Sequence, residues 1–404
     1  MVLSDSSAEV AEKYNLNKNE IEANVDIEKN LRVFSNDLTF LNIKESQRTK
    51  HVHRLHPYLG KFIPQLVEVF LKKYFKQGDF ILDPFVGSGT TLIVANELGI
   101  NSVGVELSPF NALICKVKAD VYDFNKLRFE LNDILKKTKE FSENLRAGKT
   151  VEKFSTESKY LNDWFAPAAL QEILFFRAQI GNYDYQDLFK VILSRAARSS
   201  RLITHYELAR PKEPIKDRYW CIKHKRYCMP TEDAFKFIWR YGWDTYYRLK
   251  EFSEIRSNTD VIILQGDSRN INLPKEIKFD GIFTSPPYVG VIDYHDQHEY
   301  AYELFNSPRL DEKEIGPAKK GQGWQSREDY FKDIIAVFTN MKRFLKPNAK
   351  VFIVANDKFN LYPKIGKACG FELIDTFNRP VLMRTARTGH PYFESIFYFK
   401  NKES

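Results

Sequence analysis

Features that define several large protein classes are scarce or missing in this sequence. Its 404 residues contain only four cysteines, too few for a disulfide framework, so we expect a protein of the reducing cytoplasm. No stretch approaches the roughly 18 uncharged apolar residues that a membrane helix needs. The first residues, MVLSDSSAEVAEKYN, have neither the basic start nor the apolar core of a secretory signal. We therefore expect neither export nor membrane insertion.

Two well-known phosphate-binding motifs are also missing from the segment Asp83–Thr91, which reads DPFVGSGTT. A P-loop needs a lysine after its last glycine, where this chain has Thr90. A dinucleotide-binding loop has three spaced glycines, and here only Gly87 and Gly89 are present. The segment is therefore expected to bind neither a triphosphate nor a dinucleotide.

What is present describes a folded, basic protein. Hydrophobic residues make up 43% of the chain and charged residues 28%, proportions that are typical of a globular protein and exclude wholesale disorder. The length allows two or three domains, or one large core with an insertion. Lys and Arg exceed Asp and Glu by 61 − 53 = 8, which weakly favours a polyanionic partner.

Strand and helix patterns alternate after a polar leader. Residues 1–50 are charged, with scattered apolar positions, and are expected to form a loosely attached leader with short helices. A helical pattern starts near Pro64 and is followed by a buried strand at 79–83 that runs into the glycine-containing segment. The next predicted elements are a helix at 92–98, a strand at 101–106 and a helix at 111–118. This order predicts a doubly wound, mostly parallel α/β sheet.

The alternation stops in residues 125–256, where helical patterns dominate. Strand patterns return at 261–264, 279–284 and 350–355, and residues 372–374 and 394–399 suggest a final antiparallel pair. The sequence therefore predicts one α/β core, formed by residues 51–124 and 257–404. A helical insertion, residues 125–256, would divide it.

The insertion carries most of the net charge. Residues 195–256 hold 15 Lys and Arg against 8 Asp and Glu, and three of the five tryptophans. Basic side chains interleaved with aromatic ones suit a nucleic-acid surface. A helical subdomain with an aromatic core and a solvated face would have the same composition.

Candidate binding residues follow the predicted strands of the core. Glu106 ends the second strand, 17 residues after Gly89, where an acid can hold ribose hydroxyls. Asp267 follows the strand 261–264 and could accept a hydrogen bond from an adenine amine, or simply cap a helix. Thr284-Ser285-Pro286-Pro287-Tyr288 follows the strand 279–284. Its prolines fix the backbone, which leaves carbonyls and a hydroxyl to grip an amino group and an aromatic ring to stack on a base.

These motifs resemble those of the amino-methyltransferases that modify exocyclic nitrogens of DNA bases. DPFVGSGTT is similar to the cofactor loop of that family, TSPPY to its catalytic loop, and His56–Pro64 to its N-terminal cofactor-contact motif. The similarity covers about residues 51–120 and 260–400. It implies a Rossmann-like methyltransferase fold, with an antiparallel terminal strand and the helical insertion as a DNA-recognition region.

The resemblance also implies a cofactor, S-adenosylmethionine, and a role for each motif residue. Glu106 would hold the ribose, Asp267 the adenine amine, and the other cofactor residues would shape or close the methionine pocket. The implied cofactor-binding residues are Lys61, Phe62, Asp83, Pro84, Phe85, Gly87, Gly89, Thr90, Glu106 and Asp267. The implied catalytic residues, which would hold the target base, are Ser285, Pro286, Pro287 and Tyr288.

The implied activity is site-specific methylation of cytosine N4 in duplex DNA after base flipping. Serine before Pro-Pro-Tyr is typical of cytosine-N4 enzymes in the family, whereas Asp or Asn there is typical of adenine-N6 enzymes. Adenine-N6 methylation, methylation of an RNA amine and a non-catalytic nucleic-acid-binding protein remain alternatives. The resemblance further implies a restriction–modification system with a cognate endonuclease, in a prokaryotic cytoplasm and bound to the nucleoid through DNA.

Two clusters of metal-ligand residue types lie outside these motifs. Cys221-x2-His224-x3-Cys228 could gain a fourth ligand from His205, but structural zinc needs four ligands at compatible spacing. His295 and His298 follow the catalytic loop, and methyl transfer needs no metal. The sequence alone therefore predicts no metal site and favours free thiols in a basic loop, with zinc at Cys221, His224 and Cys228 as the alternative.

Overall fold

A seven-stranded mixed sheet forms the centre of the core. The computed structural model describes residues 38–40, 43, 45–58, 60, 63–207, 211–381 and 392–402. Its large sheet has the strand order β5-β2-β1-β6-β7-β9-β8, in which β9 runs antiparallel to both neighbours and the other pairs are parallel. The strands are β1 Phe80–Asp83, β2 Asn101–Glu106, β5 Val261–Gln265, β6 Phe279–Thr284, β7 Leu345–Ala355, β8 Phe371–Val381 and β9 Tyr392–Asn401. The predicted doubly wound sheet with an antiparallel last strand is confirmed.

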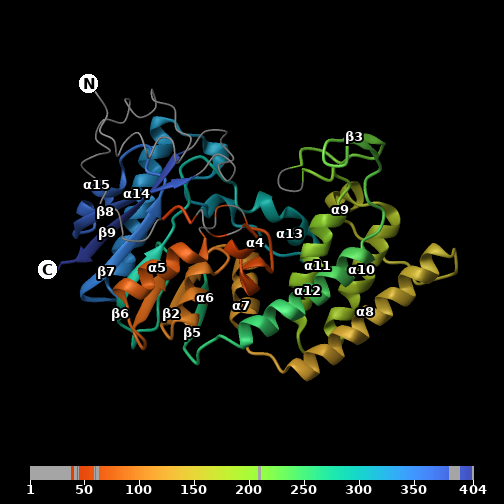
Figure 1. The fold of residues 1–404 in the computed structure, drawn as a ribbon. Helices are drawn as coiled ribbons and strands as arrows, with labels where there is room; N and C mark the ends of the chain where they lie inside the picture. The colour runs from red at the N-terminus through yellow and green to blue at the C-terminus, as the bar shows by residue number, and fades with distance from the viewer. Residues whose placement is uncertain are drawn as a thin grey trace.

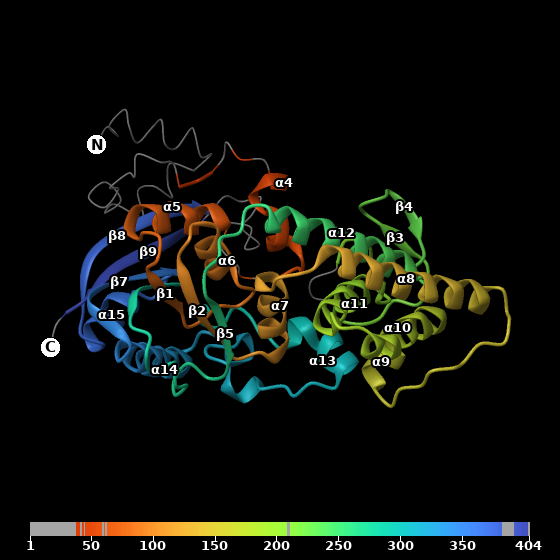
Figure 2. The same ribbon diagram turned by 90° about the horizontal axis from the view of Figure 1, so that it is seen from below.

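Helices cover both faces of this sheet (Figure 2). One face packs against α5 and α6 through a core that includes Phe70 and Phe352, and the other packs against α14 and α15 through Phe338 and Ile365. The helices outside the insertion are α4 Glu45–Arg48, α5 Pro64–Tyr74, α6 Thr90–Glu97, α7 Pro109–Ala119, α13 Glu299–Phe305, α14 Trp324–Lys342 and α15 Tyr362–Ala368. The central strands β1, β2 and β6 are buried along most of their length and do not alternate between buried and exposed residues, whereas the edge strand β8 is partly exposed.

A second, helical unit lies beside the β5 edge of the sheet (Figure 1). It follows α7 and consists of α8 Phe124–Arg146, α9 Lys159–Trp164, α10 Pro167–Gln179, α11 Gln186–Ser200 and α12 Phe235–Ser253. A small hairpin of β3 Tyr219–Cys221 and β4 Arg226–Cys228 projects from it. The apolar side chains of α7 and α13 pack into the same core as those of the unit, so the unit is joined to the sheet by a continuous core.

The two connections of the helical unit meet at one point. Arg256, between α12 and β5, donates from Nη1 to the carbonyl of Asp120 at 2.5 Å and from Nη2 to the carbonyl of Ala119 at 3.0 Å. These carbonyls belong to the end of α7, where a cationic side chain also favours the helix dipole. The two chain segments that connect the unit to the sheet therefore lie side by side.

The described residues include no helix that is long and apolar enough to cross a membrane. Most of the predicted leader, residues 1–37, lies outside the described residues.

Candidate active site

A pocket opens where the carboxyl ends of β1, β2, β5 and β6 meet. This edge is where doubly wound sheets bind their ligands, because the strand order reverses there and leaves a crevice. Acidic, aromatic and backbone groups from both halves of the core contribute to it. The lining residues are Tyr58, Pro84, Phe85, Gly87, Val105, Glu106, Leu107, Ser108, Gly266, Asp267, Ser268, Ser285, Pro287, Tyr294, His295, Lys313, Glu314 and Ile315.

The glycine-containing loop after β1 forms the floor of the pocket. Gly87 and Gly89 have φ angles of 52° and 85°, in the left-handed region that glycine adopts without strain. A Cβ atom on Gly87 would lie 3.0 Å from the hydroxyl of Tyr58, and one on Gly89 would lie 3.1 Å from the sulfur of Cys115. Both positions thus need glycine for their backbone angle and for the close approach of a neighbour.

Glu106 is held by the same loop. Its Oε2 accepts a hydrogen bond from the backbone N–H of Gly87 at 2.9 Å, and its Oε1 accepts one from the N–H of Ser108 at 2.9 Å. Burial raises the pKa of Glu106 to about 7, although these hydrogen bonds and one from Asn111 act in the opposite direction. The carboxyl group therefore changes charge near neutral pH, at a fixed position in the pocket wall.

Asp83 connects the glycine loop to the loop after β6. Thr284 Oγ1 donates to Asp83 Oδ1 at 2.6 Å, and the N–H of Phe85 donates to the same oxygen at 3.0 Å. Asp83 is almost fully buried, and burial raises its pKa to about 6. It lies behind the pocket and joins the two predicted motifs, rather than lining the cavity itself.

The Ser-Pro-Pro-Tyr loop is braced on two sides. Ser285 and Pro287 line the pocket, and the Pro287 carbonyl accepts a hydrogen bond from Tyr330 at 2.9 Å. The hydroxyl of Tyr288 donates to Glu394 Oε1 at 3.2 Å. The ring of Tyr288 is thereby tied to β9, and the loop has a hydrogen-bonding partner on each side.

Asp267 is paired with a side chain that the sequence analysis did not consider. Arg269 donates from Nη2 to Asp267 Oδ2 at 2.7 Å, from Nε to both carboxylate oxygens, and from its backbone N–H to Oδ1. Burial would raise the pKa of Asp267, but these bonds to Arg269 hold it below its usual range. Arg269 in turn contacts Asp333 of α14 at 2.8 Å, which fixes the carboxylate at the pocket wall.

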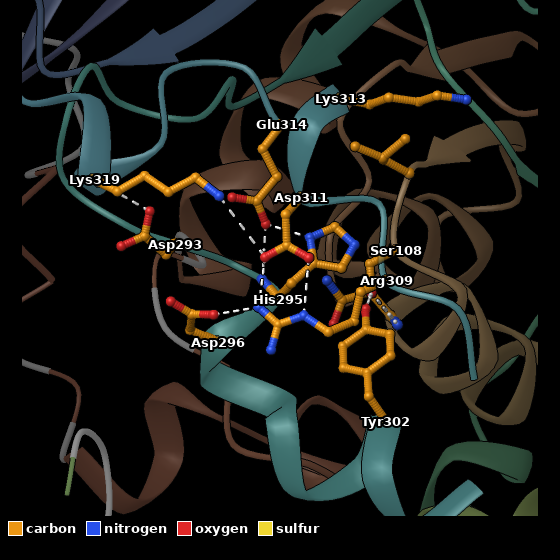
Figure 3. Close-up of polar contacts among 12 residues, drawn as sticks. Ser108, Asp293, His295, Asp296, Tyr302, Arg309, Asp311, Lys313, Glu314 and Lys319 are labelled. Atoms are coloured by element: carbon orange, nitrogen blue, oxygen red, sulfur yellow. Dashed lines mark hydrogen bonds and ion pairs between the residues drawn. The ribbon is translucent and has the colours of Figure 1, made fainter. Parts of the chain in front are cut away.

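A further side of the pocket is formed by the segment 293–319, which follows the Ser-Pro-Pro-Tyr loop (Figure 3). His295 contacts Glu314 through both its backbone N–H, at 2.8 Å, and its ring Nδ1. Arg309 binds Asp296 and Asp311 in the same segment. Sequence reasoning singled out His295 only as a metal-like residue and missed Glu314, Tyr294 and Tyr58; Tyr58 lies inside the motif His56–Pro64 and was the one that could have been found.

The structure brings most of the predicted site residues to one place. Those that line the pocket are Pro84, Phe85, Gly87, Glu106, Asp267, Ser285 and Pro287. Gly89, Pro286 and Tyr288 lie in the same two loops, Asp83 ends β1 and Thr90 begins α6, and none of the five lines the pocket. Lys61 and Phe62 lie outside the described residues.

Comparison with known proteins agrees with this geometry. A family model described as DNA methylase, of the N6 and N4 type, matches residues 5–117. The Type II methyltransferase M.MjaII of Methanocaldococcus jannaschii is 42% identical, over 91% of this chain and 83% of its own length. The chain belongs to the DNA amino-methyltransferase family.

Other similarities are more distant. The Type II methyltransferase M.BsoBI of Geobacillus stearothermophilus is 29% identical to this methyltransferase, over 69% of this chain and 57% of its own length. Among solved structures, TrmN from Thermus thermophilus matches with a TM-score of 0.33 and 12% identity, over 85% of this chain and 50% of that one.

The pocket of the methyltransferase fits the family's cofactor, S-adenosylmethionine. Three carboxyl groups line it, those of Glu106, Asp267 and Glu314, and they suit a ligand with sulfonium and ammonium charges. Within the described part of the chain, Glu314 Oε2 and His295 Nε2 are buried without a hydrogen-bond partner. Buried polar atoms nearly always have a hydrogen-bond partner, so these two atoms are suited to bind polar groups of a ligand. The enzyme uses S-adenosylmethionine to methylate DNA.

Proposed function

We propose that this methyltransferase modifies the N4 amine of cytosine in a specific sequence of duplex DNA. The observation that carries the proposal is Ser285, which lines the pocket directly before Pro286-Pro287-Tyr288. A serine hydroxyl can accept a hydrogen bond from the amine without adding charge. The resemblance described above associates serine at this position with cytosine N4 rather than adenine N6.

The proposed chemistry depends on positioning. The cytosine amine is conjugated with its ring and is a poor nucleophile. Hydrogen bonds from its N–H groups to the Ser285 hydroxyl and the Pro286 carbonyl would localise the nitrogen lone pair, while Tyr288 stacks on the base. S-adenosylmethionine supplies an electrophilic methyl group. Attack would form the N–C bond as the C–S bond breaks and the neutral thioether leaves, and the methylated nitrogen would then lose a proton to water.

Each predicted binding residue would have its own role toward the cofactor. Pro84, Phe85 and Gly87 would contact the methionine part, and Glu106 would accept the ribose hydroxyls. Asp267 lines the pocket with its carboxylate held by Arg269, and it would accept the adenine amine there. Asp83, Gly89 and Thr90 would support the loop from behind, and Lys61 and Phe62 would close the methionine pocket.

We also propose that the helical unit, residues 125–256, binds DNA. Exposed aromatic side chains support this role, with Trp220, Tyr227 and Tyr247 more than half exposed in the basic part of the insertion. Base flipping opens the duplex and exposes bases. A surface of basic and aromatic side chains can bind the separated strands through their phosphates and by stacking on the bases. In the cell the enzyme would act on the nucleoid of a prokaryote, as the modification partner of a restriction endonuclease.

The proposed product can be identified directly. Transfer of labelled methyl groups to unmethylated genomic DNA, followed by digestion and mass spectrometry of the nucleosides, should yield N4-methylcytosine. Bulk RNA, incubated in parallel, should stay unlabelled. N6-methyladenine would refute the assignment based on Ser285 while leaving the family unchanged, and label in RNA alone would refute the substrate.

Cofactor affinity should depend on the charge of Glu106. Ribose hydroxyls donate to a carboxylate, and the pKa of Glu106 is about 7 in the ligand-free protein. Binding therefore favours the ionised form, so affinity should rise with pH through about 7 and fall by up to about tenfold per unit below it. Calorimetric titration with the cofactor between about pH 5.5 and 8.5 would measure this slope.

Glu106→Gln is the control for that titration. It should weaken binding by about 10- to 100-fold, the cost of a lost charged hydrogen bond, and remove the pH dependence. If the variant kept the wild-type slope, another group would be responsible. Asp83, with a pKa of about 6, would be the first to consider.

A further inference from the structure

Four residues with metal-binding side chains converge at the base of the β3–β4 hairpin. His205, Cys221, His224 and Cys228 each offer one ligand atom, and these atoms all lie within 4.8 Å of one another. The Sγ atom of Cys221 lies 3.8 Å from Nδ1 of His205, and the Sγ atom of Cys228 lies 3.5 Å from Nδ1 of His224. The cluster lies in the insertion, and no step of the proposed methyl transfer uses it.

The distances match a tetrahedral metal site. Zinc binds thiolate sulfur at about 2.3 Å and imidazole nitrogen at about 2.0–2.1 Å, so neighbouring sulfur and nitrogen ligands lie about 3.6 Å apart. Both measured distances are within a few tenths of an ångström of that value. Separate thiol–imidazole hydrogen bonds would explain each pair but would not require four ligand atoms to share one centre.

Three of the four ligand residues lie in the β3–β4 hairpin, and the fourth comes from a separate segment. Cys221 ends β3, and a tight turn follows in which Lys225 has a φ angle of 52° and its N–H donates to the Cys221 carbonyl at 2.7 Å. His224 lies inside this turn, and Cys228 ends β4. His205 reaches the cluster from the end of a separate segment, and its N–H bonds to the Tyr219 hydroxyl at 2.9 Å.

The hairpin has little else to stabilise it. Each strand has three residues, and an isolated two-stranded hairpin is marginal in water. Trp220, Ile222 and Tyr227 are 53%, 66% and 61% exposed, whereas Cys221 and Cys228 are buried. The cysteines therefore face the inside of the hairpin, while its large apolar side chains face solvent. Apolar packing alone gives the hairpin little stability.

We propose that His205, Cys221, His224 and Cys228 bind one Zn²⁺ ion as a closed structural site. Two thiolates with two imidazoles form a ligand set that zinc favours, and four protein ligands leave no position for a reactive water. The sequence named His205 as a possible fourth ligand but predicted no metal, because the spacing alone does not place His205 beside Cys-x2-His-x3-Cys. The fold brings His205, 16 positions before Cys221, to the other three residues.

A second histidine-containing group must be distinguished from this site. His51, His53 and Glu97 also bring ligand atoms together. There, however, the carboxylate of Glu97 already forms an ion pair with Lys50, and only three groups take part. A cation beside the carboxylate disfavours a second cation, so this group serves as an internal control.

Metal analysis of the purified full-length chain tests the proposal. After expression with added zinc and dialysis without chelator, mass spectrometry of the elements should find about one zinc per chain. Cys221→Ser and Cys228→Ser should each reduce the zinc content below about 0.2 per chain. Cys369→Ser, the same change at a buried cysteine near α15, and His53→Asn should retain it.

A second measurement addresses variants that fail to fold. Removal of zinc from the unmodified protein with a chelator should make the segment around residues 205–229 sensitive to protease. Added Co²⁺ should give the thiolate charge-transfer absorption of a cysteine-bound metal. Less than about 0.2 zinc in the unmodified protein, or zinc that persists in both cysteine variants and disappears in His53→Asn, would overturn the proposal.

Discussion

Replacement of Ser285 with alanine is expected to slow methyl transfer about 100-fold while cofactor affinity stays unchanged. Ser285 lines the pocket and follows Thr284, whose hydroxyl is fixed by Asp83 at 2.6 Å. The serine hydroxyl would hold one hydrogen of the target amine only when the base is in place. Its loss therefore removes an interaction that aligns the nitrogen, and the rate constant should fall more than the binding constants.

Single-turnover kinetics with labelled cofactor would measure the rate, and calorimetry the cofactor affinity. Ser257→Ala is a matched control, because Ser257 precedes the amino end of β5, outside the helical unit and away from the carboxyl ends of the strands where the pocket lies. It should behave as the wild type. A normal rate for Ser285→Ala would show that the hydroxyl does not align the amine.

The second large effect is expected at Gly87. A valine there should weaken cofactor binding about 100-fold. Its Cβ would meet the hydroxyl oxygen and two ring carbons of Tyr58 at 3.0–3.2 Å, and its methyl groups would extend into the pocket that Gly87 lines. The φ angle of 52° adds conformational strain, which costs about 1–2 kcal/mol for residues other than glycine.

Gly148→Val is a control that introduces the same backbone strain as Gly87→Val without a steric clash. Gly148 has a φ angle of 69°, and a Cβ atom there would meet nothing within 4 Å. We expect both variants to lower the melting temperature and only Gly87→Val to weaken cofactor binding, as measured by thermal unfolding with and without cofactor. Equal cofactor affinity in the two variants would show that the loop does not contact the ligand closely.

The core and its two main motifs could be predicted from the sequence because parallel strands end at one edge. The strands that end near Asp83, Glu106 and Thr284 are short and apolar, and the polar residues after them must meet once the strands pair. The helices of the insertion were also visible from their periodicity. No such rule places the residues of long loops.

The unpredicted parts of the pocket come from contacts between distant segments. His295 and Glu314 are 19 positions apart in irregular structure, and neither belongs to a periodic pattern. Asp267 was predicted to bind the cofactor, but its pairing with Arg269 depends on a turn whose shape the sequence does not reveal. The β3–β4 hairpin is too short to give a strand pattern, and the approach of His205 to Cys221 depends on that hairpin.

The contact of Arg256 with the last carbonyls of α7 has a consequence for the evolution of such enzymes. Since Asp120 and Arg256 are in contact, the helical unit begins and ends at a single point on the edge of the sheet. An insertion between adjacent ends can lengthen, shorten or be exchanged without moving the strands on either side. If the unit reads DNA, as we propose, a lineage would acquire a new target sequence by replacing this module and keep its inherited chemistry intact.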